Sequence, residues 1–98
     1  GWKALAVNVS DLGAMGAAPL ACLVTLMLPP ETAPVWIQGL YRGFADAAVH
    51  FGCPVAGGDT VRSAVLGLNV TALGSLPAGQ EVCRSGASVG DWLCVTGV

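Results

Sequence analysis

The sequence has 98 residues, of which 54% are hydrophobic and only 10% are charged, and its net charge is −2. A chain of this length forms one domain at most, and charged residues make up about a quarter of an ordinary soluble domain. The four basic residues are spread along the chain, which argues against a nucleic-acid-binding surface. So few charges suggest that further protein covers much of the surface, either the rest of a longer chain or a second subunit. We therefore expect a fragment.

Neither the apolar stretches nor the cysteines indicate a membrane or extracellular protein. The longest apolar stretch, residues 20–28, is interrupted by Thr25 and followed by Pro29-Pro30. It is far shorter than the roughly 20 residues that span a bilayer. The cysteines are widely spaced and form no C-x-x-C pair; they are Cys22, Cys53, Cys83 and Cys94. We expect them to be reduced, in a cytoplasmic protein.

The first predicted element is a helix over residues 2–18. Its large apolar side chains recur every three or four residues, as on one face of a helix; they are Leu5, Val9, Leu12 and Met15. Gly13 and Gly16 weaken its end, and Pro19 stops it. A strand over residues 20–28 follows, and its continuous apolar run favours a strand covered on both faces.

A second helix is predicted between Thr32, as its N-cap, and Gly52, where it stops. Its apolar stripe consists of Trp36, Leu40, Phe44, Ala47 or Ala48, and Phe51. We then expect a short strand over residues 53–56, a turn at Gly57-Gly58, a longer strand over 66–73 and a last strand over 92–96. This order predicts an α+β fold or a split βαβ sheet, with a mixed or antiparallel sheet and helices on one face.

Two carboxylates stand in otherwise apolar or glycine-rich surroundings, where a buried acid would need a cation or hydrogen-bond donors. Asp11 has one of two roles: it caps a helix end or pairs with a group near it, or it binds a metal ion. Asn8 lies one helical turn earlier on the same face. Asp59 is either a turn residue or a magnesium ligand. The second reading gains from the two glycines before Asp59, since they let a phosphate approach the backbone N–H groups.

Two further side chains are candidates for nucleotide contacts. Arg84 lies in a Ser/Gly loop, where a guanidinium either grips a phosphate through two hydrogen bonds or stays solvated. Tyr41, beside the apolar stripe of the second helix, either lies against a base or ribose or is an ordinary half-buried tyrosine. The chain has no P-loop, and His50 has no acidic or serine partner nearby that would make it a general base.

Three segments resemble, in order and spacing, the N-terminal domain of the thiamine-monophosphate kinase family. They are "GWKALAVNVSDLGAMGAAPLACLVTLMLP", "FGCPVAGGDT" and "RSGASVGDWLCVTG", and together they cover nearly the whole chain. The segment around Asp11 is shared more loosely by other members of the aminoimidazole ribonucleotide synthetase superfamily. The segment Gly57-Gly58-Asp59-Thr60 looks like the kinase version. Members of this superfamily share an ATP-binding α+β domain that pairs with its twin in a dimer.

The resemblance implies transfer of the γ-phosphate of ATP to thiamine monophosphate, giving thiamine diphosphate, with several Mg²⁺ ions and a homodimer. It implies that Asp11 and Asp59 are magnesium ligands in a shared cation cluster. It also implies that the backbone of Gly58 faces the nucleotide phosphates beside Asp59, and that Arg84 and Tyr41 contact ATP.

The same resemblance implies that residues 1–98 are a partial N-terminal ATP-binding and dimerisation domain. The acidic G-D-D segment of the family, expected upstream of Gly1, and the C-terminal domain are not in this sequence. We therefore expect residues 1–98 to be inactive by themselves. Two alternatives stay open: another ATP-dependent synthetase of the same superfamily, and a non-catalytic dimerisation module in which Asp11 and Asp59 are cap and turn residues.

Overall fold

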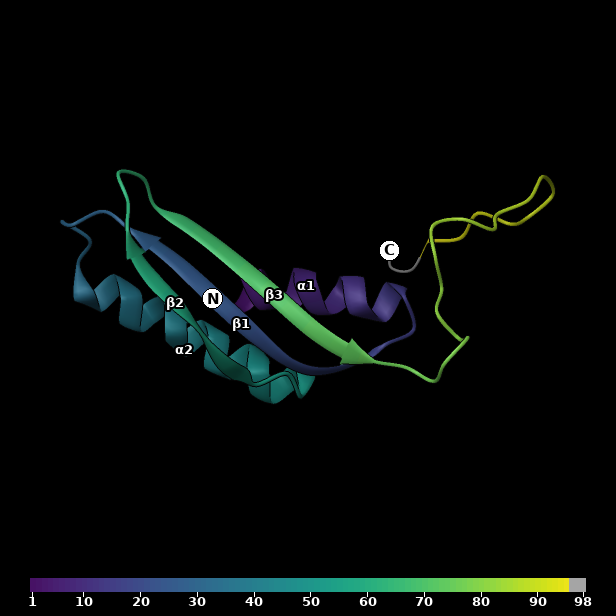
Figure 1. Ribbon diagram of the computed structural model, residues 1–98, viewed down its shortest axis with the longest axis horizontal. Coiled ribbons are helices and arrows are strands. Elements are labelled where there is room, and N and C mark those ends of the chain that lie inside the picture. The colour runs from purple at the N-terminus through teal and green to yellow at the C-terminus, as the bar shows by residue number, and fades with distance from the viewer. Residues whose placement is uncertain (96–98) are drawn as a thin grey trace.

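Three strands and two helices make up the fold in a computed structural model, which describes residues 1–95. The elements follow in the order α1 (Trp2–Ala14), β1 (Ala18–Leu28), α2 (Pro34–Phe51), β2 (Val55–Arg62) and β3 (Gly67–Ser75). The sheet has the order β2-β1-β3, with β1 parallel to β2 and antiparallel to β3 (Figure 1). The predicted α+β fold with a mixed sheet is confirmed. Because β1 and β2 are neighbours, β1-α2-β2 is an unsplit βαβ unit.

The core lies between both helices and one face of the sheet. Alternate residues of β1 point to this face, as the period of two in a strand requires. The fully buried side chains are Leu5 of α1, Cys22, Val24 and Leu26 of β1, Phe44 and Ala47 of α2, and Cys53. Because α1 and α2 contribute to the same core cluster as Cys22 and Val24, the predicted placement of the helices on one face is also confirmed.

The opposite face of the sheet is open in this chain. Leu23, between two buried positions of β1, is 41% exposed, and Leu73 on β3 is 50% exposed. The expectation that both faces of residues 20–28 are covered is therefore wrong for this chain. A run of apolar residues indicates that both faces of the strand are hydrophobic. It does not indicate whether residues of the same chain cover both faces.

Both helices differ from the prediction at one end. Helix α1 ends at Ala14, and the chain turns at Gly16, which has a φ of +79°. Pro19 therefore lies inside β1, next to an irregularity in the β3 pairing, where a missing N–H is tolerated. Helix α2 has Ala33 as its N-cap with Pro34 in the first turn, one residue later than Thr32. Its predicted stop at Gly52 is confirmed, with a left-handed φ of 64°.

Gly57 and Gly58 lie within β2 and do not form the predicted turn. The β1–β2 pairing is irregular at Ala56, because Cys22 pairs with Val55 and Leu23 with Gly57. Gly58 has a φ of 149°, and a Cβ at this position would overlap the carbonyl oxygen of Val24. The pair of glycines therefore marks a place where two strands approach each other closely. Such a contact requires a residue without a side chain, as many turns do.

The chain after β3 has no helix or strand as far as residue 95 and extends away from the sheet (Figure 1). The strand predicted over residues 92–96 is not formed by residues 92–95, and residue 96 lies outside the described residues. One backbone hydrogen bond ties this segment to α1: the Val82 N–H donates to the Met15 carbonyl oxygen at 3.1 Å. Among the described residues, no helix is long and apolar enough to cross a bilayer.

Two of the four cysteines lie together in the core. Cys22 and Cys53 are both fully buried, whereas Cys83 and Cys94 are exposed. Burial raises the pKa of the Cys22 thiol, and the neighbouring Cys53 raises that pKa further. The neutral thiol is therefore favoured in the folded protein. This contribution to stability is present below the ordinary thiol pKa and is lost as the pH rises through the raised pKa of Cys22.

Replacing Gly58→Ala will lower the free energy of unfolding by about 3 kcal/mol, because the new Cβ forces β2 away from Val24 and strains the backbone. Gly39→Ala is the matched control, since a Cβ at Gly39 of α2 meets no atom within 4 Å apart from its chain neighbours and the backbone of its own helix. That change will raise stability by up to about 1 kcal/mol through helix propensity. Urea unfolding followed by circular dichroism measures both, and equal midpoints for the two variants would contradict the strand contact.

Ellman's reagent, which reacts with free thiols, will modify Cys83 and Cys94 of the native protein at about pH 8 as fast as it modifies an unhindered thiol. Cys22 and Cys53 will react only after denaturant is added, because they are buried and Cys22 resists ionisation. The double variant Cys83→Ser and Cys94→Ser is the control and loses the fast phase. Fast modification that persists in this variant would show that the core is open.

Candidate functional site

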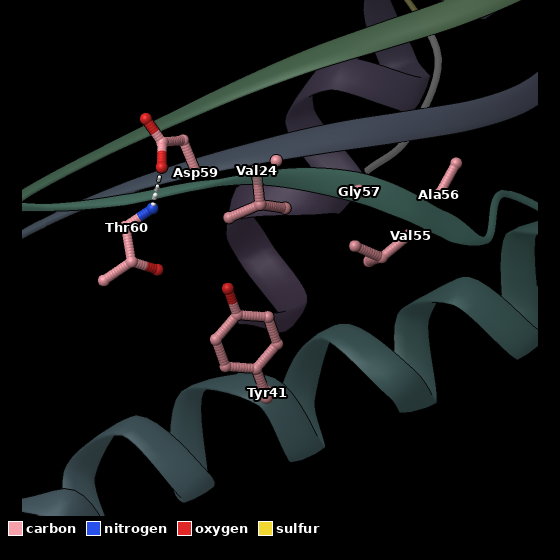
Figure 2. Close-up of a pocket in the computed structure, with 8 residues that line it drawn as sticks. Val24, Tyr41, Val55, Ala56, Gly57, Asp59 and Thr60 are labelled. Carbon is pink, nitrogen blue, oxygen red and sulfur yellow. Dashed lines mark hydrogen bonds between the residues drawn. The ribbon is translucent and has the colours of Figure 1, made fainter.

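A pocket of about 560 Å³ lies between β2 and α2. Its size is within the range of small-molecule binding sites. It is lined by Val24 of β1, Tyr41 of α2 and six consecutive residues of β2, namely Val55, Ala56, Gly57, Gly58, Asp59 and Thr60 (Figure 2). Three of the four residues predicted to contact ATP, Tyr41, Gly58 and Asp59, therefore lie at one pocket.

Tyr41 reaches this pocket because of its position on α2. It lies three residues before the buried Phe44, and residues three apart are neighbours on a helix surface. Its ring packs against Phe44 with a centroid distance of 5.8 Å, which fixes the side chain. The Tyr41 hydroxyl points from α2 toward β2 (Figure 2). The ring thus offers one flat apolar face and one polar group to the pocket.

The backbone of Gly58 offers a hydrogen-bond donor on the pocket side of β2. The Ser63 N–H donates to the Leu28 carbonyl oxygen at 2.9 Å, so odd-numbered residues at this end of β2 face β1. Because strand backbone groups alternate in direction, the N–H groups of Gly58 and Thr60 face away from β1. The Thr60 N–H is bound by the Asp59 carboxylate. The Gly58 N–H therefore faces the free edge of β2, and Gly58 has no side chain of its own beside it.

The Asp59 carboxylate lies on the open face of the sheet. Asp59 pairs with Thr25 of β1, and its side chain points away from α2, whereas Thr60 points toward α2 (Figure 2). One carboxylate oxygen, Oδ1, accepts the Thr60 N–H at 2.8 Å. This hydrogen bond orients the carboxylate and leaves Oδ2 available to a cation. Asp59 is exposed, so its charge does not need a buried partner.

Asp11 and Arg84 line a second pocket of about 420 Å³. It lies between the end of α1 and the chain after β3, and its other lining residues are Ala14, Met15, Val82 and Cys83. The hydrogen bond from Val82 to Met15 holds this segment against α1 and so brings Arg84 to the pocket. A carboxylate and a guanidinium in one pocket suit a phosphate together with a cation.

The structure does not bring the two predicted magnesium ligands together. Asp11 and Asp59 line different pockets, and no group of three or more His, Cys, Asp or Glu side chains within residues 1–95 is arranged to hold a metal ion. The alternation along β2 places the Asp59 carboxylate on the open face, whereas α1 packs on the opposite face. The cation cluster inferred from the resemblance is therefore not formed by this part of one chain.

Two polar residues near Asp59 were missed by the sequence reasoning. Thr25 pairs with Asp59 on one side and with Asn69 of β3 on the other, so all three side chains lie on the open face. The signal that identifies Thr25 was present, since it is the one polar residue in the apolar run of residues 20–28.

Comparison with known proteins assigns the chain to a family. Residues 1–76 match the model of the family described as AIR synthase related protein, N-terminal domain. The chain is 43% identical over 97 residues to the thiamine-monophosphate kinase of Synechococcus elongatus, an alignment that covers 99% of this chain and 30% of that protein. The chain thus spans about 30% of the length of that curated relative.

Solved structures share the fold. The thiamine-monophosphate kinase from Stenotrophomonas maltophilia K279a is 46% identical with a TM-score of 0.81, over 92% of this chain and 28% of that one. AaThiL complexed with AMPPCP and TMP is 36% identical with a TM-score of 0.73, over 74% of this chain and 24% of that one. The family match over residues 1–76 and the shared fold show that the chain belongs to the AIR synthase related protein family, through its N-terminal domain.

Proposed function

We propose that the protein carrying this chain is a thiamine-phosphate kinase, which transfers the γ-phosphate of ATP to thiamine monophosphate and yields thiamine diphosphate. The observation that carries the proposal is the 43% identity to a thiamine-monophosphate kinase over 97 residues, nearly the whole chain. The complex of AaThiL, 36% identical, with AMPPCP and TMP supports a nucleotide and a second phosphate compound as ligands. We further propose that the protein is cytoplasmic.

The pocket between β2 and α2 suits one end of a nucleotide. Tyr41 lies against the base or ribose, and the Gly58 N–H donates to a phosphate oxygen. Asp59 and Asp11 hold Mg²⁺, for which carboxylates are the preferred protein ligands, and Arg84 binds a phosphate from the second pocket. Bound Mg²⁺ neutralises the charge that builds up on the phosphates. Because phosphoryl transfer depends on positioning and charge neutralisation, these residues need not include a general base.

Residues 1–98 are, in this proposal, a partial N-terminal domain of the kinase. Asp11 and Asp59 lie at different pockets, so the remaining magnesium ligands come from phosphates, water and protein outside the described residues. Mg²⁺ takes most of its ligands from water and phosphate oxygens, so one carboxylate is enough to hold each ion. The 98 residues by themselves do not complete this site and are inactive.

The open face of the sheet supports a homodimer. Leu23 and Leu73 are half exposed, and Ala21 lies directly beside Leu73 in the β1–β3 pairing. Apolar residues grouped on one sheet face favour burial against a second apolar surface. A second copy of the chain offers the same surface, so a symmetric contact buries both.

Replacing Asp59→Asn in the complete protein that carries this chain will lower turnover of ATP and thiamine monophosphate by on the order of 100-fold or more, because it removes a negative ligand of the cation. Asp46→Asn is the matched control, since Asp46 is exposed on α2 and lines neither pocket. Coupled-enzyme kinetics measures both. An Asp59→Asn enzyme with unchanged turnover would favour the non-catalytic reading of Asp59 as a purely structural residue.

Replacing Leu73→Asp in the same protein will convert the dimer to a monomer, because a charge at the centre of an apolar contact is desolvated without a partner. Val49→Asp is the control, since Val49 is 87% exposed on α2, away from the sheet. Light scattering after size-exclusion chromatography gives the mass of each variant. A Leu73→Asp protein that stays dimeric would exclude this face from the interface.

A further inference from the structure

Two thiols lie together in the core, where the end of α2 connects to β2. Cys22 of β1 and Cys53 are both fully buried and belong to the same core cluster. Cys22 pairs with Val55 across the β1–β2 ladder, and its N–H donates to the Pro54 carbonyl oxygen at 2.9 Å. The chain that directly follows Cys53 therefore lies against Cys22. The two side chains are also close enough for a hydrogen bond between them.

The backbone fixes Cys53 on both sides. Before it, Gly52 ends α2 in the left-handed region, and the Cys53 N–H donates to the Ala48 carbonyl oxygen at 3.0 Å. After it, Pro54 has a restricted φ and is hydrogen-bonded to β1. A disulfide requires two Cα atoms within about 7 Å of each other and side chains that point toward each other. Neighbouring strands lie about 5 Å apart, so the start of β2 brings Cys53 to such a position beside β1.

The thiol pair lies next to the pocket between β2 and α2. Val24 and Val55 line this pocket (Figure 2). Cys22 comes two residues before Val24, and Cys53 comes two residues before Val55. Residues two apart on a strand share a face, so Cys22 and Val24 point to the same side of β1. A covalent bond between the two sulfurs would therefore join two walls of the pocket at one end.

We propose that Cys22 and Cys53 form a redox pair, which a small-molecule disulfide of the glutathione type converts to an intramolecular disulfide. The thiolate of one cysteine attacks glutathione disulfide, forms a mixed disulfide and releases one glutathione thiolate. The thiolate of the other cysteine attacks the protein sulfur of this mixed disulfide and releases the second glutathione thiolate. The two thiol protons of the protein are taken up by the two glutathione thiolates. Two protein thiols are thus oxidised, and one glutathione disulfide is reduced to two glutathione molecules.

The pair is protected while the core is closed. Burial keeps glutathione away from both sulfurs and raises the pKa of the Cys22 thiol, which lowers the amount of reactive thiolate. Oxidation therefore requires local opening at the end of α2, where Cys53 lies. Once formed, the bond closes a loop that contains all of α2 and constrains the unfolded chain. The redox pair does not depend on the proposed kinase activity.

The test is refolding of the complete protein that carries this chain in a glutathione redox buffer, followed by acid quenching, alkylation and peptide mapping. The ratio of the Cys22–Cys53 disulfide to the dithiol will be higher by about 10-fold or more in the refolded protein than in the same buffer with concentrated urea, because the fold holds the two sulfurs together. Circular dichroism establishes that the protein is folded. An equal or lower ratio in the folded protein overturns the proposal, since the fold would then not favour the bond.

The variant Cys53→Ala is the control for the effect of the bond on stability. Oxidation will raise the urea midpoint of the native protein, and it will leave the midpoint of Cys53→Ala unchanged. The double variant Cys83→Ser and Cys94→Ser lacks the exposed thiols and will keep the full rise on oxidation. A rise of the same size in Cys53→Ala, or loss of the rise in the double variant, would assign the effect to other cysteines and overturn the proposal.

Discussion

The fold depends on the position of β1 between β2 and β3. Both edges of β1 are hydrogen-bonded, and one of its faces supplies Cys22, Val24 and Leu26 to the core under the two helices. A central strand with paired edges and one buried face has a fixed register, because a slip by one residue would exchange the buried and open faces. Every candidate site residue on the sheet takes its direction from this register. The pocket beside α2 and the open face are therefore consequences of how β1 is held.

Gly58 links this packing to the site on β2. The two strands approach so closely there that a side chain would overlap the Val24 carbonyl, so the residue that permits the contact is also the one with an uncovered backbone. Since direction alternates along a strand, Gly58 presents its N–H at the pocket edge while Asp59 presents its carboxylate to the open face. One short segment thus offers a donor for an anion and a ligand for a cation. Glycine is required at position 58 because β1 and β2 lie so close together there. The same lack of a side chain leaves the Gly58 N–H available for binding.

The sequence predicts the helices better than it predicts the sheet. The stripe in α2 has a period that only a helix satisfies, and Gly52 ends it as expected. Gly57-Gly58 misleads, because glycine serves turns and close strand contacts equally, and only the pairing with Val24 distinguishes them. For the site, the local sequence identifies Tyr41, Gly58 and Asp59, which do lie together. It does not reveal that Asp11 lies elsewhere, because that depends on which face of the sheet α1 covers. It does not reveal that Thr25 lies beside Asp59 either, because that depends on the pairing of distant strands.

The charges of the two pockets explain why cations are required if a triphosphate binds here. Arg84 is the only basic side chain among the lining residues of either pocket, and it lies at the second one with Asp11. The pocket of Tyr41 and Gly58 has no basic lining residue, and its one charged lining residue, Asp59, points its carboxylate to the open face of the sheet. A polyphosphate beside a carboxylate experiences repulsion that one backbone N–H does not offset. A divalent cation bound between the polyphosphate and the carboxylate attracts both and replaces their repulsion. The acidic residue therefore favours anion binding only when the metal ion is bound together with the nucleotide.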